Sequence, residues 1–313
     1  MRDDIGENPL FHVNVLKKYI KALIVNVKPE FLPPKVNLIF DSGAVNGLTG
    51  IGAALYIHHL AEAHYIKINK IAGCSIGALI AVWYSCGCPD TIYTDIDTLF
   101  SYYKANKNFF IFEDVVRKAI YQLYPNDAAP GIMLNEKLYI NYYDTKKKKQ
   151  RVISKFKSRT HLITCILRSS HIPFLTSCAH KFQGRYVDGI SPHLFTEHKR
   201  CKNLFIKLIT FTSPFKALNI KREKNIYSRL INGVVATNDF FINNSTTVCS
   251  YVTLKTKIEL WWRLYFCYFI LYLIDTLIVF KKNIPPSFKS TFCYTKIASF
   301  GHLSWFSLLD NLT

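Results

Sequence analysis

Two strand-like segments, each followed by a glycine-containing turn and then by a helix-like pattern, constrain the fold more than any other feature of this sequence. The short apolar run "VNLIF" (36–40) is followed by "DSGAVNG", and a second strand candidate, near Ile66 to Ala72, leads into Gly73. Helix-like stretches follow, from Leu48 to about Ala63 and from Ile76 to about Ser85. Strand, turn and helix repeated in this way favour an α/β fold with a mostly parallel central sheet.

The rest of the chain divides by composition. An apolar pattern over 10–25 predicts an N-terminal helix, and "EFLPPK" then breaks the chain. We interpret "HLITCIL" (161–167) and "NLFIKLITF" (203–211) as further strands, and from Leu260 the composition becomes strongly apolar. The predicted organisation is an N-terminal helical extension (1–34), a central domain (35–250) and a hydrophobic C-terminal segment (251–313).

Charge and cysteine content limit the binding partners and the cellular compartment that the sequence allows. The 313-residue chain has a formal net charge of +19, which favours anionic partners such as acidic lipid or nucleic acid. Its nine cysteines include no CxxC pair, which indicates free thiols in a reduced compartment, and no zinc-ligand spacing is present. The start, "MRDDIGENPL", lacks the apolar core of a secretory signal. We therefore expect an intracellular protein without a metal or other cofactor.

The segment Gly73-Cys74-Ser75-Ile76-Gly77 fits the pattern G-x-S-x-G at the second strand-to-helix junction. A serine on such a sharp turn needs small neighbours, and the helix after it points N–H groups at a developing negative charge. This pattern predicts Ser75 as a nucleophile, with Gly73 and Gly77 forming the elbow. The alternative is a helix start whose small residues serve close packing only.

Two further elements supply what a nucleophilic serine needs. The turn Ser42–Gly47 ends the first predicted strand and can present backbone N–H groups to an oxyanion. In "RYVDGIS", Asp188 follows a short strand-like Tyr-Val and precedes Gly189. Taken singly, these two segments are better explained by an ordinary strand-to-helix connection and by a plain Asp-Gly turn.

Together, in this order, the three elements resemble the patatin-like phospholipase family over roughly residues 35–215, and the stretch "SSHIPF" (169–174) adds to the match. The resemblance implies a three-layer α/β/α fold and a lipid acyl hydrolase that works through a Ser-Asp dyad and an acyl-enzyme, on phospholipid or neutral lipid. The implied residues are the nucleophile Ser75, the base Asp188 with its motif glycine Gly189, and an oxyanion hole formed by Gly43, Ala44 and Gly47.

The sequence departs from the family pattern at two positions. Asn46 stands where the oxyanion motif has a cation, and Ile190 follows Asp188-Gly189 where a small residue is usual. These departures keep open a catalytically weak or inactive lipid-binding relative. A Ser-Asp-His triad is a further alternative, with His193, His198 and His302 after the acid.

The run "LYFCYFILYLIDTLIVF" (264–280) contains one charged residue, Asp275, and is flanked by Trp261, Trp262 and Arg263 and by two lysines. Aromatic and basic flanks are typical of interfacial anchors, and the insertion energy of the run is only marginally favourable. We expect this helix to attach the protein to an anionic membrane surface, with spanning, interfacial and buried-core modes all open. The basic run Lys146–Lys149 would assist, and binding to nucleic acid is the less favoured use of the charge.

Overall fold

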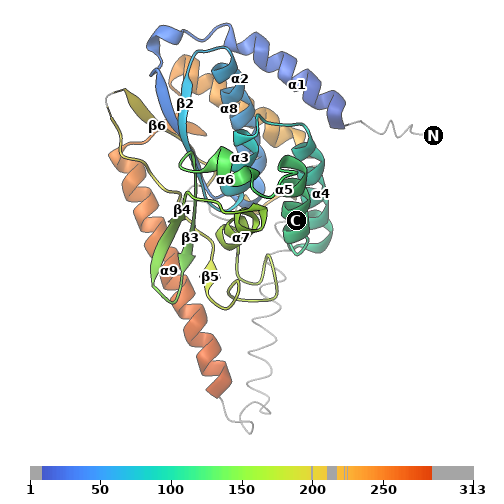
Figure 1. The fold of residues 1–313 in the computed structure, drawn as a ribbon, viewed down its shortest axis with the longest axis vertical. Helices are drawn as coiled ribbons and strands as arrows, with labels where there is room; N and C mark the ends of the chain where they lie inside the picture. Colours follow the sequence, from blue (N-terminus) through green and yellow to red (C-terminus); the bar gives the residue numbers. More distant parts are fainter. Residues whose placement is uncertain (1–8, 199, 210–216, 222, 224, 284–313) are drawn as a thin grey trace, which may run out of the picture.

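The computed structural model describes residues 9–198, 200–209, 217–221, 223 and 225–283 (Figure 1). Within this part of the chain, seven strands form one sheet in the order β4-β3-β2-β1-β6-β7, and β5 pairs with β3. The strands are β1 (Lys35–Phe40), β2 (Lys67–Gly73), β3 (Leu138–Asp144), β4 (Lys149–Ile153), β5 (Tyr186–Val187), β6 (Cys201–Ile206) and β7 (Cys249–Tyr251).

The centre of the sheet is parallel and its margins are antiparallel. β1 pairs in parallel with β2 and β6, and β2 pairs in parallel with β3. β4 and β5 run antiparallel to β3, and β7 runs antiparallel to β6. The mixed α/β fold with a mostly parallel central sheet is therefore confirmed.

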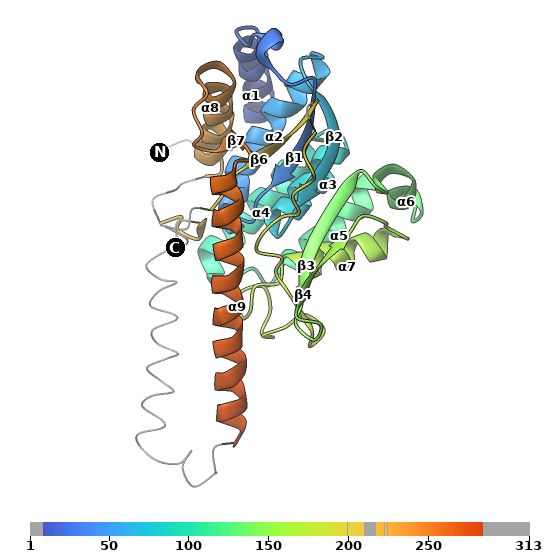
Figure 2. The same ribbon diagram turned by 90° about the vertical axis from the view of Figure 1, so that its left-hand side faces the viewer.

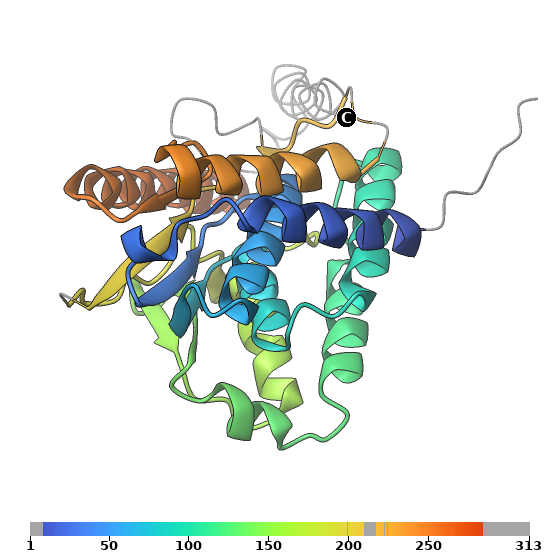
Figure 3. The ribbon, with the colours of Figure 1, turned by 90° about the horizontal axis from the view of Figure 1, so that it is seen from above.

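Helices account for most of the remaining chain. They are α1 (Pro9–Ile24), α2 (Gly47–Glu62), α3 (Ile76–Ser85), α4 (Thr91–Asn106), α5 (Phe112–Leu123), α6 (Ala129–Leu134), α7 (Arg159–Ser169), α8 (Tyr227–Asn243) and α9 (Leu254–Asn283), with 3₁₀ turns at Pro29–Phe31 and Ala44–Asn46. Figure 3 shows α1 and α8 side by side over α2, with which both are in contact. The predicted helices at 10–25, 48–63 and 76–85 correspond to α1, α2 and α3.

The two faces of the sheet are covered unequally. Leu38 and Phe40 of β1 point into a large apolar core shared with α1–α5, α7 and α8. Ile39, on the opposite face, joins a small cluster with Phe205 of β6 and Leu260 of α9. The C-terminal helix thus contributes to covering the second face of the sheet.

One segment differs from the sequence-based expectation. Residues 161–167 were expected to be a strand and lie instead within the helix α7. A short continuous apolar run fits a buried strand and a buried helix equally well. The start signal of α7 is Ser158, whose Oγ accepts the N–H of His161 at 3.1 Å as an N-cap.

The expected C-terminal apolar helix is present as α9. Figure 2 shows it as a long rod that starts beside β6 and β7 and projects beyond the rest of the described domain. Its stretch Leu254–Val279 is the one helix of the described residues that is long and apolar enough to cross a membrane. The predicted domain divisions at 34/35 and 250/251 stay predictions. In the structure α1 packs on α2, and α9 joins the small apolar cluster on the second face of the sheet.

Candidate active site

Ser75 lies in the tight turn between β2 and α3, at the carboxyl end of the parallel strands. Its backbone has φ 56° and ψ −134°, a conformation that a residue with a side chain rarely adopts. The flanking glycines allow this turn to pack. A Cβ on Gly73 would lie 2.2 Å from the carbonyl oxygen of Gly77, and one on Gly77 would lie 2.4 Å from that of Asp41. Strained backbone of this kind occurs where a side chain must be presented in one direction.

A second serine fixes the backbone of Ser75. The Ser75 N–H donates to Oγ of Ser169 at 2.9 Å, and this hydroxyl donates in turn to the carbonyl oxygen of Asn141 at 2.7 Å. The chain therefore ties the serine turn to β3 and to the end of α7. Sequence reasoning placed Ser169 only within the family-like stretch "SSHIPF" and gave Asn141 no role.

Asp188 follows β5 and is held by the same segment. Its N–H donates to the carbonyl oxygen of His171 at 2.9 Å, and the Gly189 N–H donates to that of Ser169 at 3.2 Å. A Cβ on Gly189 would lie 2.3 Å from the carbonyl oxygen of Asn141, so only glycine fits here without movement. Ser169 and Asn141 thus contact both the serine turn and the aspartate turn.

The side chains of Ser75 and Asp188 meet. The Ser75 hydroxyl donates a hydrogen bond to the Asp188 carboxylate, and both side chains are buried. Burial raises the pKa of Asp188 from its ordinary value of 3.8 to about 7. The hydrogen bonds from Ser75 and from the Ile190 N–H, and the charge of Arg263, act in the opposite direction on this pKa. A carboxylate with a pKa near 7 can both accept and return a proton at neutral pH.

The glycine-containing turn 42–47 lies next to the serine and contains a one-turn 3₁₀ helix, Ala44–Asn46. Ala44 has φ 43°, which favours a small side chain, and it lines the same pocket as Ser75. The Gly47 N–H is engaged within the turn, on the carbonyl oxygens of Ala44 and Val45. The N–H groups of Gly43 and Ala44 have no acceptor among the described residues, and neither has that of Ile76 at the start of α3.

At Asn46 the structure adds a cation that the sequence pattern lacks. The guanidinium of Arg229 on α8 donates to Oδ1 of Asn46 and pairs with Glu223. The amide of Asn46 donates to the carbonyl oxygen of Leu208 at 2.7 Å. A positive side chain therefore reaches the position of the motif cation from another helix, which only the fold could reveal.

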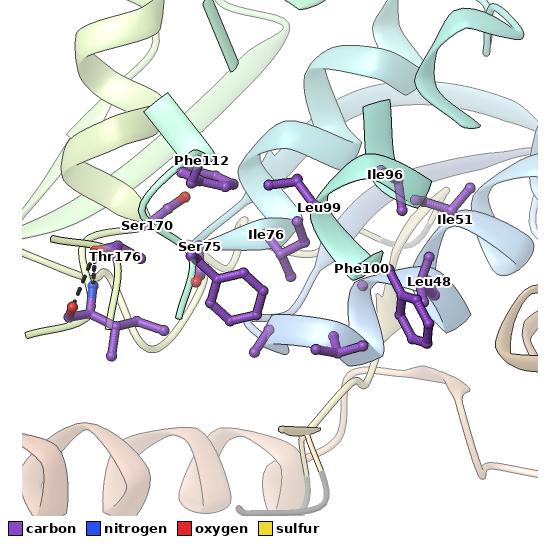
Figure 4. Close-up of a pocket in the computed structure, with 15 residues that line it drawn as sticks. Leu48, Ile51, Ser75, Ile76, Ile96, Leu99, Phe100, Phe112, Ser170 and Thr176 are labelled. Atoms are coloured by element: carbon purple, nitrogen blue, oxygen red, sulfur yellow. Dashed lines mark hydrogen bonds between the residues drawn. The ribbon is translucent and has the colours of Figure 1, made fainter. Parts of the chain in front are cut away.

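An apolar pocket opens at Ser75. Figure 4 shows Ser75 and Ser170 toward one end, with Ile51 and Phe100 toward the other. The pocket is lined by Ala44, Val45, Gly47, Leu48, Ile51, Ser75, Ile76, Ile96, Leu99, Phe100, Phe109, Phe112, Ser170, Ile172 and Thr176.

The histidines considered as triad members lie elsewhere or outside the described residues. His193 and His198 line a second pocket near the start of β1 and β2, where His193 stacks on Tyr139 at 5.5 Å between ring centroids. His302 is outside the described residues. Within the described part of the chain, no histidine side chain is hydrogen-bonded to Ser75 or Asp188.

The protein is a mixed α/β protein with a glycine-flanked serine at a strand-to-helix turn, a place where serine nucleophiles occur. Residues 38–190 match the family model of patatin-like phospholipase, and the chain therefore carries a patatin-like phospholipase domain. Members of this family are in general esterases and phospholipases that act on lipids. Among curated proteins, none matches the chain closely enough to be counted as a relative.

Proposed function

We propose that the protein hydrolyses carboxylic ester bonds of membrane lipids, with Ser75 as nucleophile and Asp188 as its base. The observation that carries this proposal is the hydrogen bond from the Ser75 hydroxyl to a buried carboxylate whose pKa is about 7. A serine needs an adjacent base to attack an ester, and a base works best when its pKa lies near the operating pH.

In the proposed reaction, Ser75 Oγ attacks the ester carbonyl carbon while its proton passes to Asp188. The N–H groups of Gly43, Ala44 and Ile76, which have no acceptor among the described residues, are candidate donors to the oxyanion that forms. When the intermediate collapses, the leaving alcohol takes the proton from Asp188 and the acyl group stays on Ser75. Water then attacks the acyl-enzyme and gives a proton to Asp188, which passes it to Ser75 Oγ as the bond between that oxygen and the acyl carbon breaks and the fatty acid is released.

The apolar pocket at Ser75 suits the acyl chain of the substrate. Its lining from Leu48, Ile51, Leu99 and Phe100 carries no charged side chain that would need hydration. Burial of each methylene of a fatty acyl chain contributes about 0.8 kcal/mol.

We further propose that α9 attaches the protein to a membrane surface. Its large apolar and aromatic side chains are exposed, with Tyr272 67% and Leu277 64% accessible, alongside Trp261 and Trp262. Tyr268 of α9 stacks on Tyr143 at 4.0 Å between ring centroids, just before the β3–β4 hairpin tip that carries the exposed Lys146–Lys149. Lysines beside an aromatic face favour a surface with anionic lipid.

The charged residues of α9 favour a position along the surface over a crossing. Glu259 pairs with Lys207, Arg263 with Asp41 and Asp275 with Lys181, so these three charged side chains of the helix are bound to the domain. A crossing would separate these pairs and carry charge into the bilayer, which is costly.

A covalent probe and a release assay test the proposed function. A fluorophosphonate ester should label the wild-type protein, and Ser75→Ala should abolish both labelling and fatty-acid release from phospholipid vesicles or triacylglycerol emulsions. Ser85→Ala is the matched control, because Ser85 lies at the far end of α3 and its hydroxyl donates only to the carbonyl oxygen of Ala81.

The lipid-binding alternative gives a different result. If the wild-type protein binds vesicles but releases no fatty acid from any of them, the result would favour a non-catalytic lipid-binding protein over a hydrolase. Labelling that persists in folded Ser75→Ala would show that Ser75 is not the nucleophile.

A further inference from the structure

A buried ion pair joins the C-terminal helix to the end of the first strand. Arg263 lies on α9, a helix whose large neighbouring side chains are mostly exposed, yet it is only 6% accessible. Its guanidinium binds both carboxylate oxygens of Asp41, which is fully buried directly after β1, and Nη1 lies 2.9 Å from Oδ2. Such a two-pronged arginine–carboxylate contact fixes orientation as well as distance.

Asp41 belongs to the frame of the active site. Its Oδ1 accepts the N–H of Ser42 at 2.9 Å, and its Oδ2 accepts those of Leu208 and Ile209 at 3.3 and 3.4 Å. The first of these bonds fixes the entry to turn 42–47. The carbonyl oxygen of Asp41 also lies under Gly77, where a Cβ would approach to 2.4 Å. One residue therefore supports both the serine turn and the turn next to it.

The charge of Asp41 is also close enough to act on Asp188. Asp41 and Arg263 influence the Asp188 carboxyl in opposite directions, Asp41 favouring its protonated form and Arg263 its ionised form. Among the described residues, the other titratable groups that interact with the charge of Asp188 are Cys74 and Cys267 of α9, and the Ser75 hydroxyl is hydrogen-bonded to it. With Arg263 in place, the two charges largely offset each other at the base.

We propose that Arg263 is a positioning residue of the active site, through which the docked C-terminal helix holds the Asp41-anchored turns and neutralises the charge beneath them. This inference rests on the proposed hydrolase function. It means that the helix that meets the membrane also completes the site. Loss of its docking would then lower hydrolysis even of a soluble ester, for which membrane binding is irrelevant.

The test uses a water-soluble short-chain ester and the full chain. Arg263→Gln should lower kcat/KM by about 10- to 100-fold, the range found where a residue that orients a functional group is lost. Glu259→Gln is the matched control, because it removes an ion pair between the same helix and the half-buried Lys207, and neither side chain of this pair bonds to the Asp41 carboxylate. It should stay within about threefold of wild type, the scale of a weak, partly exposed pair.

The pH profile separates positioning from a general loss of structure. In Arg263→Gln the charge of Asp41 remains, so the pKa of Asp188 should rise above about 7 and the acidic limb of kcat/KM should move to higher pH. The double variant Asp41→Asn/Arg263→Gln removes both charges, so its acidic limb should return toward that of wild type. Arg263→Lys keeps the charge and should retain most of the wild-type limb position.

The possible outcomes distinguish a failure of the proposed hydrolase function from a failure of the proposed role of Arg263. A wild-type protein that hydrolyses neither soluble esters nor lipids would overturn the proposed function. An active wild type whose acidic limb is unchanged in folded Arg263→Gln, or is moved as far by Glu259→Gln, would overturn the role of Arg263. Circular dichroism at each pH establishes that the variants compared are folded.

Discussion

The backbone N–H of Ile190 donates a 2.7 Å hydrogen bond to Oδ1 of Asp188, two residues earlier in the chain. Ile190 has φ 61°, an unfavourable value for a β-branched residue, and its carbonyl oxygen accepts the hydroxyl of Ser42 at 2.9 Å. The departure from the family pattern at this position therefore leaves the backbone contact with the aspartate in place. The side chain changes while the N–H that orients the carboxylate is kept.

The first prediction concerns the base. Asp188→Asn keeps the size of the side chain but removes the proton acceptor, so kcat should fall by about 100- to 10,000-fold. In the wild type, kcat/KM should fall as pH drops through about 7, because the buried carboxylate is then protonated. The measurement is the pH dependence of ester hydrolysis from pH 5 to 9.

Histidine variants are the control for this assignment. His193→Ala and His198→Ala alter residues of the second pocket, and His302→Ala alters one outside the described residues. All should keep hydrolysis within a few-fold of wild type. A large drop in one folded variant would favour a triad over the dyad.

The second prediction concerns the serine turn. Gly77→Ala places a Cβ 2.4 Å from the carbonyl oxygen of Asp41, a backbone atom that cannot move away on its own. Overpacking of this kind costs about 1–3 kcal/mol, and the displaced turn should lose most labelling by the fluorophosphonate. Gly87→Ala is the comparison: its φ of 79° also disfavours alanine, but a Cβ there meets nothing within 4 Å. It should cost stability, measured by urea unfolding, and leave labelling unchanged.

How far the sequence predicts this molecule depends on the range of the contacts. The turns at Ser75 and Asp188 are local, since glycine spacing and strand ends determine them, and the sequence locates both. The contacts from Ser169 and Arg229 come from other elements, as does the Arg263–Asp41 pair, whose partners are 222 residues apart. No local pattern specifies such pairings. The wrong strand prediction for residues 161–167 shows that local patterns can also mislead. When the N-cap at Ser158 is not taken into account, this short apolar run fits a strand and a helix equally well.

The third prediction concerns the strand that presents Asp188. Asp144 at the end of β3 binds Arg185 just before β5, with Nη2 to Oδ2 at 2.6 Å, and this contact holds the pKa of Asp144 at about 2. Because this pKa is depressed, the pair stabilises the fold above the ordinary Asp value near 4, and the stabilisation is lost as pH falls toward 2. Arg185→Gln should therefore lower the free energy of unfolding at pH 7, with a smaller difference from wild type at pH 3. Urea unfolding at both pH values measures it, and an equal difference at the two would contradict the pairing.

The fourth prediction concerns the membrane surface. Trp261→Ser/Trp262→Ser removes two exposed aromatic side chains of α9 and leaves Arg263 in place, so vesicle sedimentation should drop while hydrolysis of a soluble ester persists. The remaining binding to anionic vesicles should weaken as salt rises, because exposed lysines are screened. Ile132→Ser/Met133→Ser is the matched control, since it removes two exposed apolar side chains from α6. Equal loss in both double variants would place the attachment elsewhere.

The fifth prediction concerns the far end of the acyl pocket. Ile96 lines the pocket, and Ile96→Phe would fill part of the space that Figure 4 shows on the side away from Ser75. Excluding about three methylenes of an acyl chain removes roughly 2.4 kcal/mol of burial, or about 50-fold in kcat/KM. The ratio of palmitate-ester to butyrate-ester hydrolysis should fall by about this factor, because a butyrate chain is too short to reach the substituted side chain. Ile132→Phe, on the exposed face of α6, adds the same ring outside the pocket and should leave the ratio unchanged. If the ratio is also unchanged in Ile96→Phe, the acyl chain binds along a different surface and the pocket has another occupant.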